Sequence, residues 1–157
     1  MKNHQLGWWI FIWTRTLTLD IWRLRIEMNK DIEKKFISDF ILKEYAERLF
    51  FELSGEKRQK ALARFAHAAE QIFDMRYVLK LNSADNPEML LQNIGVEASC
   101  PTYVIGGEYD GRTIPLNKVL TNVFNGCDAV VAVVKDGLAI CKFEYEKGES
   151  GKYILKK

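Results

Sequence analysis

The chain has 157 residues, which is the length of one ordinary domain and is enough to bury a hydrophobic core without disulfides or a structural metal. Apolar residues make up 48% of it and charged residues 28%, with 10 glycines and 3 prolines. This composition excludes a fibrous repeat, a disordered tail and a disulfide-stapled mini-protein, and it is typical of a soluble globular protein.

The net charge of +2 is unevenly distributed along the chain. Residues 1–27 contain four basic and two acidic side chains, whereas from Met28 onward 19 basic side chains balance 19 acidic ones. Proteins bind long nucleic acid largely through an excess of basic side chains. Because the charges of the body cancel, no binding of nucleic acid is expected.

The first 27 residues also contain all four tryptophans, and three interpretations of this Trp-rich extension stay open. It is an upstream extension with Met28 as the working start, or Trp22 to Met28 forms an extra strand, since apolar and charged residues alternate there. In the third interpretation, the extension binds a membrane interface or a partner. The apolar run from Leu6 to Trp13 has eight residues, whereas a membrane-spanning helix needs ~20. No membrane span is expected, and residues 28–157 are expected to form a single domain.

Two helices are expected in the first half of this domain. Apolar residues recur at helical spacing over residues 30–53, and a second amphipathic stripe runs from about residue 56 to residue 73. Ser54 and Gly55 break the chain between them, and this short connection predicts an antiparallel αα-hairpin. Residues 74–82 alternate weakly, which is compatible with an extended segment.

The second half of the domain combines short helices with strands. Asn86 and Pro87 start a helix that ends at Gly95, and Pro115 opens another. The sequence therefore predicts an α+β fold: an N-terminal αα-hairpin plus short helices packed on a small, mainly antiparallel sheet of about four strands. Strands are expected at residues 102–105, 129–134, 138–146 and 152–155, with a hairpin turn at Asp136–Gly137 and another turn at 149–151.

The cysteines predict neither a metal site nor disulfides. Cys100, Cys127 and Cys141 are separated by 27 and 14 residues, with no Cys-x-x-Cys pair and no nearby histidine. Zinc sites need closely spaced ligands, so no metal is expected, and no pattern predicts a cofactor. A sparse, odd number of cysteines without a secretion signal favours the reducing cytoplasm. Cys141 is expected to be buried in a strand, whereas Cys100, in a loop before Pro101, is the thiol that could be reactive.

Residues 100–107, Cys-Pro-Thr-Tyr-Val-Ile-Gly-Gly, with Leu116 and Leu120 on a later helix, resemble the proline–strand–glycine–helix end of thioredoxin-like proteins. In that family the proline is cis and faces a pair of redox cysteines. The resemblance covers about 25 residues, and the upstream Cys-x-x-Cys is missing. The chain also ends in expected strands where that family ends in a helix. The resemblance therefore implies a local similarity of fold and no redox activity.

A candidate partner surface combines a basic row with apolar residues of the first predicted helix. The row lies opposite the apolar stripe of the second predicted helix, and it can hold a phosphate or an acidic partner, although a solvated helix face has the same pattern. Apolar residues over 45–53 spread most of the way round the helix axis, so one side is either buried or presented to another molecule. The candidate surface residues are Lys57, Lys60, Arg64, His67, Phe50 and Phe51.

Catalytic patterns are sparse. Glu144 and Glu146 point to one face of a predicted strand, and paired carboxylates either perform acid–base chemistry or mark the solvated side of a sheet. Asp110 and Arg112 flank Gly111 in an expected exposed turn, where an ion pair between them is favoured over catalysis.

Two classes of function follow from these patterns. The leading hypothesis is a small cytoplasmic protein-binding module without a catalytic constellation, which neutralises or regulates one protein partner as immunity and antitoxin proteins do. A homodimer is compatible with it, and a structural subunit that uses residues 1–27 as a docking strand is a further option. The alternative is a small hydrolase or transferase that uses His67, Cys100 or the pair Glu144 and Glu146. Convergence of these side chains in one cleft would favour the enzyme.

Overall fold

The computed structural model describes residues 29–125, 130–144 and 150–157, except for the side chains of Val123, Glu144 and Ser150. The three interpretations of residues 1–27 therefore lie outside the described residues, as do the expectations for Cys127 and Glu146.

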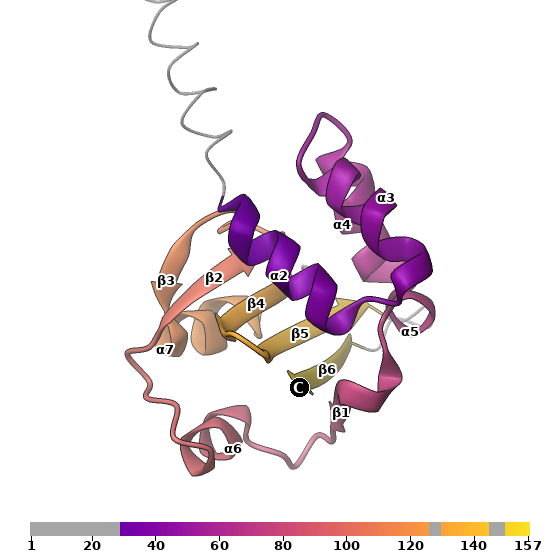
Figure 1. The fold of residues 1–157 in the computed structure, drawn as a ribbon. Coiled ribbons are helices and arrows are strands. Elements are labelled where there is room, and N and C mark those ends of the chain that lie inside the picture. The colour runs from indigo at the N-terminus through magenta and orange to yellow at the C-terminus, as the bar shows by residue number, and fades with distance from the viewer. Residues whose placement is uncertain (1–28, 126–129, 145–149) are drawn as a thin grey trace, which may run out of the picture.

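The predicted single helix over residues 30–53 is wrong, because the chain forms two helices there, α2 (Lys30–Phe40) and α3 (Lys43–Leu53) (Figure 1). Asn29 caps α2, since its side chain accepts a hydrogen bond from the Ile32 N–H at 3.3 Å. The helix then presents its apolar stripe to the sheet, as the spacing of its apolar residues predicts.

The break between α2 and α3 is stabilised by a partner distant in sequence. Ile41 has φ −98° and ψ 139°, and it forms an antiparallel bridge with Phe73. The N–H of the next residue, Leu42, donates to the carbonyl of Ile72 at 2.9 Å. These long-range backbone hydrogen bonds replace helical ones, and the helical spacing of apolar residues carries no information about them.

The second predicted helix is also interrupted. It forms α4 (Arg58–His67) and the short α5 (Ala69–Ile72), with Ala68 between them at φ −129° and ψ 22°. Helices α3 and α4 pack against each other across a connection of four residues, 54–57 (Figure 1). The predicted αα-hairpin is therefore confirmed, and it is formed by α3 and α4 rather than by two long helices.

In the described part of the chain, six antiparallel strands form one sheet in the order β1-β6-β5-β4-β2-β3. The central strands β2, β4, β5 and β6 are the four that the sequence predicts, and Asp136–Gly137 joins β4 to β5 with Gly137 at φ 68°. The strands are β1 (Val78–Leu81), β2 (Pro101–Ile105), β3 (Thr113–Pro115), β4 (Val130–Lys135), β5 (Leu138–Glu144) and β6 (Ser150–Lys156).

The expected number of about four strands is therefore too low, and the two additional strands form the edges of the sheet. β1 lies in the weakly alternating segment 74–82. β3 ends at Pro115, which is also the N-cap of the next helix, α7, so the expectation that Pro115 opens a helix is confirmed. Strands of four and three residues are too short for an alternation to stand out. The turn expected at 149–151 is also wrong in part, because Gly151 already pairs with Phe143 in the β5–β6 ladder.

Helices cover both faces of the sheet (Figure 1). The sheet therefore separates the hydrophobic core into two layers. In the first core layer, α2 to α5 pack against strand residues such as Tyr103 and Leu155. In the second core layer, the shorter helices pack against the alternate strand residues, such as Val104 and Ile140. Burial on both faces explains the continuous apolar run of β4. Among the described residues, the remaining helical segments are η1 (Met75–Tyr77), α6 (Pro87–Asn93), α7 (Leu116–Lys118) and the π-helical η2 (Val119–Val123).

The segment that resembles thioredoxin-like proteins has a different setting in this fold. The described residues contain no cis peptide bond, so Pro101 is trans where that family has a cis proline. Pro101 begins β2, which pairs antiparallel with β3 and β4. The similarity is therefore limited to the order of a proline, a strand and glycines.

Asp39 connects the helical layer to the last residue of the chain. Its side chain is 5% exposed and accepts hydrogen bonds from Lys35 Nζ at 2.7 Å and Lys157 Nζ at 3.0 Å. Burial acts to raise the pKa of Asp39, but the hydrogen bonds and charges of these two lysines outweigh it and hold the pKa below its ordinary value. The folded state therefore favours the ionised carboxylate more than the unfolded chain does.

The Asp39 contacts predict a specific loss of stability in acid. Because the folded-state pKa is depressed, the contribution is complete above the unfolded value of 3.8 and is lost as the pH falls through the folded-state pKa. We expect Asp39→Asn to lower the free energy of unfolding by about 1–2 kcal/mol at neutral pH, because two charged hydrogen bonds are weakened. The difference from the wild type should shrink at about pH 3 or below.

Urea denaturation of both proteins across this pH range measures the effect. Glu108→Gln, which removes an exposed carboxylate in the β2–β3 turn, is the control and should show a smaller pH-dependent difference. An Asp39→Asn difference that stays constant down to about pH 2 would contradict the role assigned to these contacts.

Candidate functional site

The α3–α4 hairpin carries all six residues of the candidate partner surface, but the structure does not leave them in one continuous row. Phe51 is 71% exposed near the end of α3, whereas Phe50 is half-buried against the first core layer. Lys57 is exposed at the end of the connection between the two helices, and Lys60 is exposed in the first turn of α4. His67 is exposed at the far end of α4, about 10 Å along the helix from Lys60. Phe51, Lys57 and Lys60 are called the hairpin surface below.

Arg64 is not part of an exposed basic row, because it forms an ion pair with Glu52 on the other helix of the hairpin. Its guanidinium binds the carboxylate of Glu52 on α3, whose side chain is 6% exposed. Arg48, one turn before Glu52, donates to the same carboxylate from Nε at 3.2 Å. Two arginines thus hold one nearly buried carboxylate, and the interaction between Arg64 and Glu52 fixes α3 against α4.

A buried charge cluster lies at the base of the hairpin, and Arg58, the first residue of α4, is its centre. Arg58 donates from Nη2 and Nη1 to the two carboxylate oxygens of Glu33 at 2.8 Å and 3.1 Å. It donates from Nη2 and Nε to the two oxygens of Asp110 at 2.7 Å and 2.8 Å. A further bond runs from Nη1 to the Leu53 carbonyl at 2.9 Å, so all five N–H donors of the guanidinium are used. The Tyr103 hydroxyl completes the cluster by donating to Glu33 at 2.9 Å.

Burial makes the Arg58 cluster sensitive to the loss of any member. The side chain of Glu33 is 0% exposed and that of Arg58 is 10% exposed. Burial acts to lower the pKa of Arg58, but the hydrogen bonds and charges of Asp110 and Glu33 outweigh it and raise the pKa above its ordinary value. Burial and the Glu33 charge raise the pKa of Tyr103, so its hydroxyl remains a neutral donor at physiological pH. The cluster holds α2, α4, β2 and the β2–β3 turn in one arrangement.

The expected ion-pair role in this turn is confirmed for Asp110, but its partner is the distant Arg58 and not the neighbouring Arg112. Arg112 is exposed in the turn. The Asp110 carboxylate instead accepts from the Gly106 N–H at 2.8 Å and from the Arg58 guanidinium, so it orders the turn from within. A partner 52 residues away in the chain leaves no local pattern in the sequence.

The sequence analysis did not predict the Arg58 cluster, although the positions of Arg58 and Glu33 on apolar helix stripes indicate it. Arg58 lies three residues before Ala61 and seven before Phe65, which places it on the buried stripe of α4. Glu33 lies three residues before Phe36 on the stripe of α2. Charged residues on the apolar stripes of two helices that share a core are expected to be paired, because an unpaired buried charge is strongly destabilising.

The catalytic candidates are not brought together in the described part of the chain. His67 is exposed on α4, which packs on the first core layer, whereas Cys100 packs against the second core layer on the other side of the sheet. Burial raises the pKa of the Cys141 thiol well above its ordinary value, which keeps it protonated and unreactive. The backbone of Glu144 ends β5, and its side chain lies outside the described atoms.

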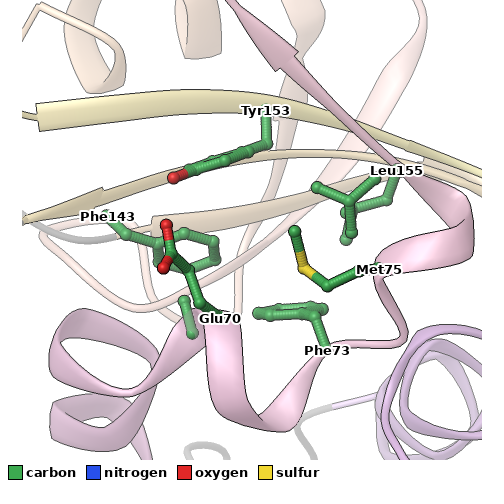
Figure 2. Close-up of a pocket in the computed structure, with 8 residues that line it drawn as sticks. Glu70, Phe73, Met75, Phe143, Tyr153 and Leu155 are labelled. Atoms are coloured by element: carbon green, nitrogen blue, oxygen red, sulfur yellow. The ribbon is translucent and has the colours of Figure 1, made fainter.

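A small apolar pocket lies between α5 and the strands β5 and β6. Figure 2 shows Phe73, Met75, Phe143 and Tyr153 gathered around it, with the Glu70 side chain beside them. Its volume of about 10 Å³ corresponds to a single water molecule. The ring centroids of Phe73 and Phe143 are 5.3 Å apart, and those of Phe143 and Tyr153 are 5.6 Å apart, so the rings already contact one another. The pocket is the margin of the first core layer and is too small for an organic ligand.

Within residues 29–125, 130–144 and 150–157, no group of three or more His, Cys, Asp and Glu side chains could hold a metal ion. None of the helices in this part of the chain is long and apolar enough to cross a membrane.

The residues that the structure describes form an α+β fold with a six-stranded antiparallel sheet covered on both faces. Comparison with protein-family models, with curated proteins and with solved structures finds no match for this chain.

Proposed function

We propose that this protein is a protein-binding module that docks one protein partner through the hairpin surface. In this proposal the protein neutralises or regulates its partner, as an immunity or antitoxin protein does. The observation that carries the proposal is the exposure of Phe51, whose aromatic side chain is 71% exposed on a regular helix. Aromatic side chains are enriched among the residues that dominate binding energy in interfaces.

The surroundings of Phe51 are suited to an interface. The residues four and three positions before it on α3, Glu47 and Arg48, are exposed and charged. Lys57 is exposed in the connection to α4, and Lys60 is exposed in the first turn of that helix. Positions three and four residues apart are neighbours on a helix, so Phe51 has charged residues beside it on α3, which is the composition of an anchor with a polar rim. The long lysine stems add apolar contact area while their ammonium groups remain solvated.

The hairpin is also held rigidly. Arg58 binds Glu33, Asp110 and the Leu53 carbonyl at one end of the turn, and Arg64 binds Glu52 across the two helices. A surface that is already ordered loses less conformational entropy when a partner binds. The buried ion pairs thereby support the proposed interface without touching the partner.

Photo-crosslinking of the full chain in its native host tests this function. A photoreactive phenylalanine analogue replaces Phe51, and in a second variant it replaces Met89, which is 59% exposed on α6. We expect a discrete crosslink to one protein, identified by mass spectrometry, from position 51 and none to that protein from position 89. A crosslink to a second copy of this chain from position 51 would identify a homodimer. Absence of any position-51 crosslink, or the same products from both positions, would overturn the proposal.

A further inference from the structure

Two lysines lie directly opposite each other on the sheet face that α6, α7 and η2 cover. Lys142 of β5 and Lys152 of β6 are partners in the antiparallel register. Both project toward the second core layer, because Ile140 and Ile154, two residues along each strand, belong to that layer. Cβ atoms of directly opposite residues lie ~5 Å apart, and like charges at such positions destabilise a sheet.

Lys142 is unusual because it is almost completely buried. It is 4% exposed and is flanked on β4 by Val130, which is 2% exposed. Lys152 is half-buried, and its Nζ lies 5.6 Å from the centroid of the Phe124 ring. Among the residues that the structure describes, no carboxylate forms an ion pair with either ammonium group. The face thus gathers two positive charges at directly opposite positions, and the side-chain stem of Lys142 is buried among apolar residues, which restricts how far the two ammonium groups can move apart.

We propose that Lys142 and Lys152 bind a phosphate group, either as the free ion or as a phosphate monoester. A dianion between the two ammonium groups converts their repulsion into two charged hydrogen bonds, and lysine binds phosphate well as a compact point charge. The apolar neighbours Val130, Ile140 and Ile154 keep the local dielectric constant low, which strengthens the attraction. The lysine pair and the hairpin lie on opposite faces of the sheet, so this site is independent of the proposed protein interface.

Thermal unfolding of the full chain in the presence of inorganic phosphate or O-phosphoserine tests the site. Sodium chloride keeps the ionic strength constant, and the melting temperature is followed as each compound is titrated. We expect the melting temperature to rise with the logarithm of the ligand concentration once that concentration exceeds the Kd. This dependence is the one that selective binding to the folded state produces. A larger rise with inorganic phosphate identifies the free ion as the preferred source, and a larger rise with O-phosphoserine identifies a monoester.

Variants of individual lysines show which residues bind the phosphate group. Lys142→Met and Lys152→Met keep most of the length of the apolar side-chain stem and remove its charge, and each should raise the Kd at least tenfold. Lys156→Met is the control, since Lys156 is exposed on the same strand and face four positions after Lys152, and it should leave the Kd unchanged. Lys142→Arg retains the charge and should retain binding, which separates loss of the site from loss of the fold.

Three outcomes would overturn the phosphate site. The first is no saturable shift with either compound in the wild type. The second is an unchanged Kd in both methionine variants. The third is a phosphate-insensitive wild type in which Lys142→Met lowers the melting temperature, because this would show that the ammonium already has a partner within the chain.

Discussion

Arg58→Met is expected to lower the free energy of unfolding by about 3–5 kcal/mol, because it removes the cation from a buried ion cluster and leaves the carboxylates behind. Glu33 would remain at 0% side-chain exposure without a countercharge, and Asp110 would lose two of its hydrogen bonds. Methionine keeps most of the apolar volume of the arginine stem, so the loss reports the charge rather than the packing. Urea denaturation at neutral pH measures the change.

Arg48→Met is the matched control for this prediction. Arg48 also forms an ion pair with a nearly buried carboxylate, Glu52, but its own side chain is 66% exposed and Arg64 still holds that carboxylate. Exposed ion pairs contribute about 0–1 kcal/mol, so Arg48→Met should cost no more than about 1 kcal/mol. Similar losses in the two variants would contradict the central position of Arg58.

Phe36→Ala is expected to lower the free energy of unfolding by about 3–5 kcal/mol, because it opens a cavity in the first core layer. Phe36 is 1% exposed, and the centroid of its ring lies 5.6 Å from that of Phe40, 6.3 Å from that of Phe65 and 6.2 Å from that of Phe73. One truncation therefore removes contacts between α2, α4 and the chain that follows α5. The midpoint and slope of urea denaturation give the change in the free energy of unfolding.

Phe51→Ala serves as the contrast to Phe36→Ala, since both remove a phenylalanine ring from an N-terminal helix. Phe51 is 71% exposed, so its truncation should change the free energy of unfolding by no more than about 0.5 kcal/mol. A loss of 2 kcal/mol or more (roughly the scale of a buried side chain) would assign Phe51 a role in the fold and remove it from the proposed interface.

The fold class and most central elements could be predicted because they depend on local patterns. The alternation and β-branched composition of β2, β4, β5 and β6 predicted the centre of the sheet, and Asp136–Gly137 predicted its hairpin. Asn86 and Pro87 predicted the start of α6, whose N-cap is indeed the Asn86 side chain. These features are encoded within ten residues or fewer.

The features that could not be predicted depend on contacts between distant segments. The bridge between Ile41 and Phe73 divides a continuous helical pattern, and no residue in that pattern is a helix breaker. The edge strands β1 and β3 exist because longer neighbours provide hydrogen-bonding partners for them. Tertiary context overrode the local preference in both cases.

The exposure of the candidate surface residues was predicted in part. Exposure of Lys57, Lys60 and His67 opposite the apolar stripe of the second helix agrees with the helical spacing. Arg64 was misplaced because the spacing of residues on one helix cannot show Glu52 on its neighbour. Phe51 was among several apolar residues of its helix, and only the packing of α3 shows that it is the one most exposed.

The affinity of the purified partner for three forms of the full chain tests the proposed function most directly. The partner is the protein identified by crosslinking, and calorimetry gives its Kd for the wild type, Phe51→Ala and Met89→Ala. The proposal predicts that Phe51→Ala weakens binding at least tenfold, which is a loss of about 1.4 kcal/mol or more, while Met89→Ala leaves the Kd within about twofold. Equal affinities for the wild type and Phe51→Ala would contradict the assignment of the hairpin surface as the protein-binding site.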